Sequence, residues 1–240
     1  MKELSLLEML KSGVHFGHQK KRWHPKMAKF IHSIRGGVHI IDLEKTAEQL
    51  NLAGGFINRI VGSGQKILFV GTKRQAQAKM KQVAESTKMP YIVERWIGGV
   101  LTNFENISRL VKRLKDLRKK REAGELVKYT KREQVKFDEE ITNLEKLIGG
   151  IQDMEKLPAA LFIIDIKREK TALREAKKKN IPVIAIIDTN NNPDLVEYPI
   201  PANDDAAKSI DYILNFLTET ISEASIKKDI SQKDEEKKTQ

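Results

Sequence analysis

The sequence predicts an α/β protein with a doubly wound parallel sheet of five strands, into which a pair of antiparallel helices is inserted. Short apolar segments alternate with amphipathic helical segments along the chain, and such strands are buried on both faces in parallel sheets. The middle of the chain carries apolar residues at spacings of three and four, the pattern of helices that pack along a seam. The five predicted strands are Val38 to Ile41, Ile67 to Val70, Tyr91 to Val93, Ala160 to Ile164 and Val183 to Ile187.

Helices are predicted between these strands because residues that start or stop helices flank each amphipathic segment. Gly62-Ser63-Gly64 ends one helix, Asn180 followed by Pro182 ends another, and Asn203-Asp204-Asp205 caps the last. Tyr198 to Pro201 is predicted to be extended and is not counted among the five strands. The predicted helices are Ser5 to Ser12, Leu43 to Val61, Arg74 to Thr87, Lys167 to Lys179 and Ala206 to Ser222.

Residues 103–157 are predicted to form a projecting coiled-coil α-hairpin. Two apolar runs have heptad spacing, and Ala123-Gly124-Glu125 between them is a helix stop, which favours two antiparallel helices. The seam residues are Ile107, Leu110, Leu114 and Leu117 in the first run and Phe137, Ile141, Leu144, Ile148 and Ile151 in the second. The hairpin then divides a discontinuous α/β domain, residues 1–102 plus 158–225, and a polar, charged tail at 226–240 is predicted to be disordered.

The predicted hairpin carries its charge unevenly. Residues 106–136 hold 12 Lys/Arg and 4 Asp/Glu, a net charge of +8, whereas residues 137–157 hold 6 acids and 2 lysines, a net charge of −4. One interpretation is an electrostatic docking surface, and the other is a solvated helix face with ion pairs inside the hairpin.

Composition favours a polyanionic partner. The formal net charge is +11 and the pI is about 9.6, which points to nucleic acid first and to an anionic membrane surface second. The chain has no cysteine, which excludes disulfides and thiolate metal sites. It shows neither an apolar signal core nor an apolar run long enough for a membrane span, so we expect a cytosolic protein without a membrane partner.

The segment from Val14 to Met27 is the strongest candidate for RNA contact. It combines lysines and an arginine, which neutralise phosphates, with histidines and Trp23, whose rings stack on exposed bases. A metal site formed by His15, His18 and His24 is an alternative, but Gly17 disfavours a helical pair of ligands, and we predict no metal. A basic loop that Trp23 merely pins to the core is the remaining alternative.

The turn Gly71-Thr72-Lys73-Arg74 between a strand and a helix could seat one phosphate on free backbone N–H groups. It lacks the glycine spacing of a P-loop and of a dinucleotide fold, so a nucleotide-binding enzyme on a Rossmann-like fold is the weaker alternative. Asp165 and Asp188 end strands where such folds place active sites, but helix capping or turn formation explains them more simply. We therefore predict no catalytic residue and no cofactor.

Eight blocks, in chain order, resemble the bacterial small-subunit ribosomal protein two family, and together they span most of the chain. They are Val14 to His18, Arg22 to Met27, His39 to Leu43, Phe69 to Lys73, Arg95 to Gly99, Leu101 to Phe104, Ile187 to Asn190 and Tyr198 to Asp205. The resemblance implies a flavodoxin-like domain with a projecting hairpin and a structural place on the small subunit. It also implies contact with small-subunit ribosomal RNA and docking of ribosomal protein one, which captures mRNA.

One loop departs from the family pattern. Asn190 to Asp194 has the sequence NNNPD where a Cys and an Asp are expected after the first Asn, which puts a thiol or metal role of that loop in doubt. The expected partners are small-subunit rRNA and neighbouring ribosomal proteins, including protein one. The residues predicted to bind RNA are His15, His18, Gln19, Lys20, Lys21, Arg22, Trp23, Lys26, Arg35, Lys73, Arg74, Arg95, Arg109, Lys112 and Arg113.

Overall fold

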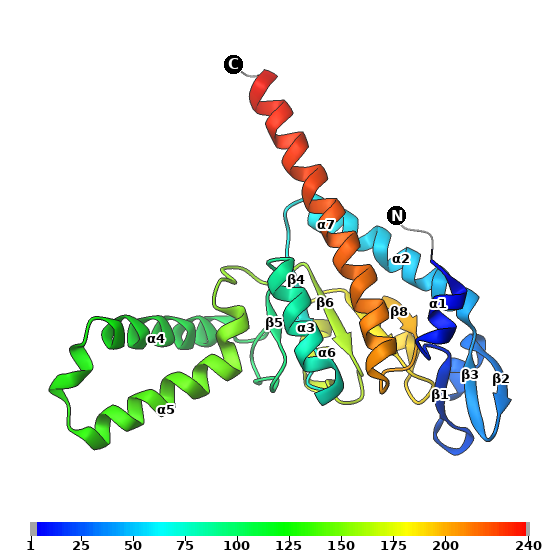
Figure 1. Ribbon diagram of the computed structural model, residues 1–240, viewed down its shortest axis with the longest axis horizontal. Helices are drawn as coiled ribbons and strands as arrows, with labels where there is room; N and C mark the ends of the chain where they lie inside the picture. The colour runs from blue at the N-terminus through cyan, green and yellow to red at the C-terminus, as the bar shows by residue number, and fades with distance from the viewer. Residues whose placement is uncertain (1–3, 239–240) are drawn as a thin grey trace.

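A computed structural model describes residues 4–238 of the chain, and its centre is a parallel sheet of five strands (Figure 1). The strands, in spatial order, are β5 (Tyr91–Ile92), β4 (Ile67–Val70), β6 (Ala160–Ile164), β7 (Val183–Ile187) and β8 (Tyr198–Pro201). Counted by their order in the chain they follow 2-1-3-4-5, the order of flavodoxin-like sheets. The predicted parallel α/β class is confirmed.

The fifth strand is not the predicted one. Val38–Ile41 forms β3, the centre of a separate antiparallel sheet between β1 (Phe16–Gln19) and β2 (Ile31–Arg35). Gly36 and Gly37 both have positive φ and join β2 to β3 in a two-residue hairpin, with Arg35 opposite Val38. A strand committed to this hairpin is paired on both edges and is unavailable to the parallel sheet.

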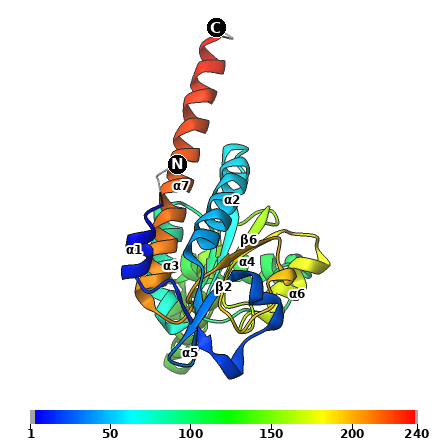
Figure 2. The same cartoon turned by 90° about the vertical axis from the view of Figure 1, so that its right-hand side faces the viewer.

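Helices cover both faces of the parallel sheet. The helices α2 (Leu43–Gly62), α3 (Arg74–Ser86) and α7 (Ala207–Lys238) pack on the face that carries Phe69 and Phe162. On the other face, α6 (Lys170–Lys178) packs with the inner ends of the inserted helices. Figure 2 shows α3 and α7 on one side of the molecule and α6 on the other. The short α1 (Leu6–Lys11), capped by Ser5, packs against α2 through the buried Met9.

Two predicted helix ends are wrong. α6 begins at Lys170 and not at Lys167, because the backbone N–H groups of Lys167 and Arg168 donate to Oδ1 of Asp165 in a turn. α7 continues to Lys238, well beyond Ser222, so the segment predicted to be disordered is helical up to that residue. Its lysines, glutamates and glutamine have a high helix propensity, which favours continuation of the helix. Residues 239–240 lie outside the described part of the chain.

The inserted segment forms α4 (Phe104–Glu122) and α5 (Lys131–Ile148), which extend away from the sheet in Figure 1. Between them lie Gly124, in the left-handed conformation, and the 3₁₀ turn η3 (Glu125–Lys128). A second turn, η4 (Gly149–Ile151), returns the chain to the sheet, where a Cβ at Gly150 would overlap the carbonyl oxygen of Tyr91. Of the predicted seam, Leu110 is exposed, Phe137 and Leu144 are half-buried, and the remaining six residues are buried.

Three further 3₁₀ turns shape the loops around the sheets: η1 (Lys20–Arg22), η2 (Pro25–Phe30) and η5 (Pro193–Leu195). η2 places Met27 and Phe30 in the core beneath the sheet face that α6 covers. Within residues 4–238, no helix combines the length and the apolar composition that crossing a lipid bilayer requires.

Candidate functional site

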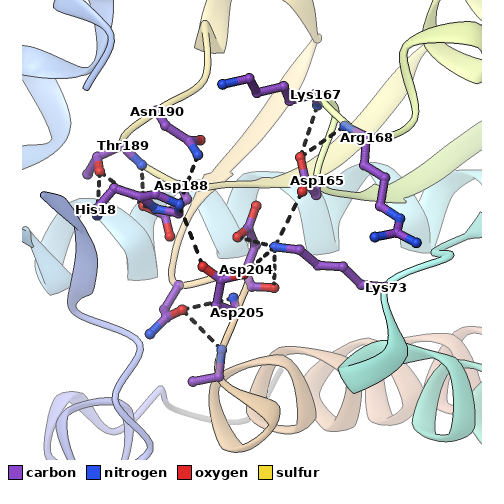
Figure 3. Close-up of polar contacts among 12 residues, drawn as sticks. His18, Lys73, Asp165, Lys167, Arg168, Asp188, Thr189, Asn190, Asp204 and Asp205 are labelled. Carbon is purple, nitrogen blue, oxygen red and sulfur yellow. Dashed lines mark hydrogen bonds and ion pairs between the residues drawn. The ribbon is translucent and has the colours of Figure 1, made fainter. Parts of the chain in front are cut away.

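Polar side chains from four parallel strands meet at the carboxyl edge of the sheet (Figure 3). Lys73 follows β4, Asp165 follows β6, Asp188 follows β7, and Asp204 with Asp205 follows β8. In parallel sheets, ligands usually bind at this carboxyl edge, close to the point where the strand order reverses. We call these five residues the carboxyl-edge cluster.

Lys73 is the centre of this cluster and is buried. Its Nζ lies 2.6 Å from Oδ1 of Asp204, 2.7 Å from Oδ1 of Asp205 and 3.3 Å from Oδ2 of Asp165. Burial alone would lower the pKa of the ammonium, but the attraction and hydrogen bonds of these carboxylates raise it above its usual value. The ammonium group of Lys73 is therefore paired with carboxylates inside the protein. Because of this pairing, the placement does not favour the predicted RNA contact of Lys73.

Several carboxylates share that one ammonium, so their negative charge is only partly balanced. Burial and the neighbouring Asp188 raise the pKa of Asp204 to about 7, although Lys73 opposes the shift. Oδ2 of Asp204 is buried and has no hydrogen-bond partner among the described residues. The raised pKa means that the Asp204 carboxyl takes up a proton near neutral pH.

We expect Asp204→Asn to change how stability depends on pH. The folded protein, with the raised pKa, binds a proton that the unfolded chain releases near pH 4, so Asp204 contributes stability at low pH that is lost as pH rises through 7. Asparagine does not titrate, so the stability of the variant relative to the original protein should rise by about 2–3 kcal/mol between pH 5 and pH 8. Urea unfolding at both pH values measures the difference. The exposed variant Asp116→Asn is the control and should differ from the original protein by the same free energy of unfolding at pH 5 and pH 8. The same result for Asp204→Asn would contradict the prediction.

His18 on β1 ties the antiparallel sheet to the carboxyl-edge cluster. Its Nδ1 lies 3.0 Å from Oδ1 of Asp188, and its Nε2 lies 3.0 Å from Nδ2 of Asn190. The bond to Asp188 is the main cause that raises the pKa of His18. Gly17 makes this approach possible, because a Cβ there would lie 2.5 Å from Cγ2 of Thr189. His18 is therefore a structural link and only half-exposed.

One group of side chains in the described residues has the geometry of a cation site. His18, Asp188 and Asp205 each offer a ligand atom, and these atoms lie within 4.8 Å of one another. His15 and His24, which the sequence placed beside His18 as metal ligands, do not belong to the group. The imidazole lies between the two carboxylates, bonded to Asp188 through Nδ1 and with Nε2 3.6 Å from Oδ2 of Asp205.

The predicted phosphate seat at the start of α3 is filled by a carboxylate of the protein. Glu169 is buried, and its Oε1 accepts from the backbone N–H of Thr72 at 3.1 Å and from its hydroxyl at 2.5 Å. Nε of Arg168 donates to the same hydroxyl at 2.8 Å. Burial raises the pKa of Glu169, although the bonds from Thr72 oppose the shift. A phosphate would have to displace Glu169 to reach the N–H and hydroxyl of Thr72, which argues against a nucleotide at this turn.

Asp165 and Asp188 form turns, as the simpler interpretation of the sequence predicted. Oδ1 of Asp165 accepts from the two N–H groups that follow it, and Oδ1 of Asp188 accepts from the N–H and hydroxyl of Thr189. Asp165 has a φ of 63°, a left-handed conformation that aspartate tolerates in such turns.

The basic residues near the N-terminus form an exposed group beside the antiparallel sheet. Lys20, Lys21 and Arg22 are exposed on η1 and form no ion pair with any side chain that the structure describes. Trp23 next to them is 39% exposed, and its ring lies 5.1 Å, centre to centre, from that of His39. We call residues 20–23 the basic loop.

The other predicted RNA-binding residues are distributed differently. Gln19, Arg35, Arg74 and Arg95 are exposed, and His15 is half-buried. Lys26 is exposed but forms an ion pair with Asp194 at 2.5 Å. In the inserted segment, Arg109 binds Glu105 and Arg113 binds Glu140, while Lys112 is exposed and forms no ion pair with a described side chain. Three more cations of α4 (Lys115, Arg118 and Arg121) reach acids in or just after α5. The interpretation as ion pairs inside the hairpin accounts for most of the α4 cations.

Sequence reasoning missed the acids that organise these sites. Asp204, Glu169 and Glu175 are all buried, yet each lies in a segment rich in polar or charged residues. For Glu175 a signal exists, because it directly precedes Ala176 and follows Ala172 by three residues, on the side of α6 that faces the core. For Asp204 no local signal exists, since its partner Lys73 is 131 residues away.

Four of the blocks that resemble ribosomal protein two contribute His18, Lys73, Asp188, Asp204 and Asp205 to the contacts at this edge of the sheet. Comparison with known proteins agrees with that resemblance. The family described as Ribosomal protein S2 matches residues 9–224. The chain belongs to the ribosomal protein S2 family. Two relatives are named small ribosomal subunit protein uS2, one from Coprothermobacter proteolyticus and one from Flavobacterium psychrophilum. The first is 48% identical over 223 residues, 93% of this chain and 83% of the relative. The second is 48% identical over 219 residues, 91% of this chain and 82% of the relative.

Membership of the ribosomal protein S2 family confirms the resemblance that the eight blocks indicated. Members of this family are structural ribosomal components and not enzymes, so the prediction of a non-catalytic chain is confirmed. The carboxyl-edge cluster then has a structural explanation: it joins the parallel sheet to the antiparallel sheet that carries the basic loop.

Proposed function

We propose that this chain is a structural component of the small ribosomal subunit that binds small-subunit rRNA through the basic loop and supports docking of ribosomal protein one for mRNA capture. The observation that carries the proposal is the exposed trio Lys20, Lys21 and Arg22 beside the exposed ring of Trp23. Cations without acidic partners neutralise phosphates, and a half-exposed indole offers a plane on which an unpaired base stacks.

The basic loop is held in place from several sides, which lowers the entropy cost of binding. The backbone N–H of Lys20 donates to the carbonyl of Gly37 at 2.9 Å, and that of His24 donates to the carbonyl of Thr189 at 2.8 Å. Both bonds lie next to the carboxyl-edge cluster or the β2–β3 turn. The loop therefore presents its cations from a fixed position and not from a flexible arm.

Ribosomal protein one would need a surface other than the basic loop. The antiparallel sheet exposes Phe16 at 49% and Ile34 at 45%, and apolar side chains of this kind suit a protein partner. We place protein one on this sheet, which leaves the cations of the basic loop to the RNA.

The inserted helices form a coiled-coil arm that docks on the ribosome, as a further part of the proposal. Its inner end belongs to the core, because Ile107, Ile148 and Ile151 pack with Leu68 and Leu161 of the sheet. Ion pairs across the two helices balance much of the charge of α4. We therefore expect the arm to contribute less electrostatic attraction to rRNA than the basic loop.

Replacing Lys20, Lys21 and Arg22 with glutamine should weaken binding to small-subunit rRNA and flatten its salt dependence. Each lost phosphate contact removes roughly 0.7 to 0.9 from the slope of log K against log salt, so three contacts remove about 2 to 3. Filter binding at several salt concentrations measures the slope. The matched control replaces Arg109, Lys115 and Arg121, which are paired with acids in the hairpin, and should change the slope less. A slope unchanged in the folded basic-loop variant would contradict rRNA binding through this loop.

A further inference from the structure

All charged side chains that are exposed in the segment 167–179 are cations. Seven exposed lysines and arginines lie in these thirteen residues, and none forms an ion pair with a side chain that the structure describes. Nε of Arg168 is bonded to Thr72, which leaves six cations without a side-chain partner. The seven residues are Lys167, Arg168, Lys170, Arg174, Lys177, Lys178 and Lys179. We call this surface the α6 ridge.

The acids of the same segment point away from the ridge. Glu169 is buried against Thr72. Glu175 is buried beneath the loop of residues 96–102 and accepts hydrogen bonds from donors of that loop. Both carboxylates are thereby committed to neutral donors inside the protein. This arrangement differs from α4, where acids of α5 lie beside the cations.

Folding alone does not account for the α6 ridge. Cations favour the last turn of a helix, which explains Lys177 and Lys178, but the positive end of the helix dipole disfavours Lys167 and Lys170 near the first turn. Like charges one turn apart, such as Lys170 and Arg174, each cost about 0.2–0.5 kcal/mol. This charge pattern lowers the stability of α6 when no ligand is bound. A bound polyanion would reduce the repulsion between the cations.

We propose that the α6 ridge binds the phosphate backbone of RNA, as a second contact surface separate from the basic loop. Lys170, Arg174 and Lys177 follow one another on one side of the helix, about 5–6 Å apart at Cβ, a spacing that suits successive phosphates. The helix exposes no aromatic residue for stacking, so the contact reads the backbone and not the bases. The ridge lies on the face opposite α3 and α7 (Figure 2). This inference rests on the proposed rRNA-binding function.

The test compares two triple variants of the full chain that change the net charge equally. Lys170→Gln with Arg174→Gln and Lys177→Gln removes the centre of the ridge, and glutamine keeps the helix propensity. Lys79→Gln with Lys81→Gln and Lys208→Gln is the control, since these lysines lie on α3 and α7. The probe is transcribed small-subunit rRNA at about 50 to 200 mM salt, the range over which backbone contacts change affinity most visibly. Circular dichroism melting verifies that both variants fold.

Loss of the ridge should lower the salt slope by about 2, at roughly 0.7 to 0.9 per phosphate contact, while the control lowers it by less than 1. Equal slopes for the ridge variant and the original protein would overturn the inference, as would equal losses in ridge variant and control. Either result, with tight and salt-sensitive binding by the original protein, leaves the proposed function standing. If the original protein binds this rRNA no better than an unrelated transfer RNA, the proposed function itself fails.

Discussion

Glu175→Ala is expected to destabilise the protein by roughly 3–5 kcal/mol, because it leaves several buried donors without a partner. Oε1 accepts from the Gly99 N–H at 2.8 Å and from Nε1 of Trp96 at 3.0 Å. Oε2 accepts from the N–H of Leu101 and from the N–H and hydroxyl of Thr102, all at 3.0 Å. This one carboxylate therefore holds together the loop that leads into α4.

The pH dependence of Glu175 supports the same expectation. Burial alone would raise the pKa of the carboxyl, but the bonds from Gly99, Trp96, Thr102 and Leu101 lower it below its usual value. The carboxylate thus contributes stability above the pKa of the unfolded chain, and this stability is lost as pH falls through the lower folded value. The difference between original and variant should shrink towards acidic pH.

Urea unfolding of the original protein, Glu175→Ala and Glu175→Gln measures the effect. The amide of glutamine offers only one acceptor oxygen to this set of donors, so Glu175→Gln should also be clearly destabilised. Exposed Glu94→Ala is the matched control and should change stability by less than about 0.5 kcal/mol. A cost for Glu175→Ala within the range of the control would show that loop and helix hold together without the carboxylate.

Lys73→Met should cost a similar amount, roughly 3–5 kcal/mol at neutral pH, because removing one partner of a buried ion pair leaves uncompensated charge. Methionine preserves much of the side-chain volume, so the loss reports on charge more than on packing. Asp165, Asp204 and Asp205 would then face one another without the ammonium. The variant should regain stability as pH is lowered, since protonation removes the repulsion.

Thermal melting of Lys73→Met at pH 5 and pH 8, with exposed Lys81→Met as control, tests this expectation. The stability deficit should be larger at pH 8. A variant as stable as the control at pH 8 would show that the cluster does not depend on the buried ammonium. A loss that is equal at both pH values would assign the effect to packing and not to charge.

The alternation of apolar strands and amphipathic helices was enough to predict the parallel sheet, because burial on both faces leaves a clear pattern. Tyr198–Pro201 was missed as a strand because proline removes backbone donors, and it is in fact the edge strand β8, where sheets tolerate proline. Val38–Ile41 was assigned to the wrong sheet because four apolar residues do not specify their partner strand. The Gly36-Gly37 turn beside it did carry the correct information.

The site could be predicted only where its residues are local in sequence. Lys20, Lys21 and Arg22 could be recognised as an exposed basic group because they are consecutive and adjoin an aromatic residue. The opposite roles of Lys73 and Arg74, one buried and one exposed, depend on contacts with Asp204 and Asp205 that come from the far end of the chain. Neither hydrophobic periodicity nor charge counting includes such contacts.

Sedimentation of the tagged protein with small ribosomal subunits at rising salt tests ribosomal binding most directly. The proposed function predicts that the protein sediments with the small subunit at low salt and is released as salt increases, since phosphate contacts weaken with ionic strength. The variant of Lys20, Lys21 and Arg22 should be released at lower salt. A protein that stays in the supernatant at every salt concentration, or that sediments equally well with the large subunit, would contradict it.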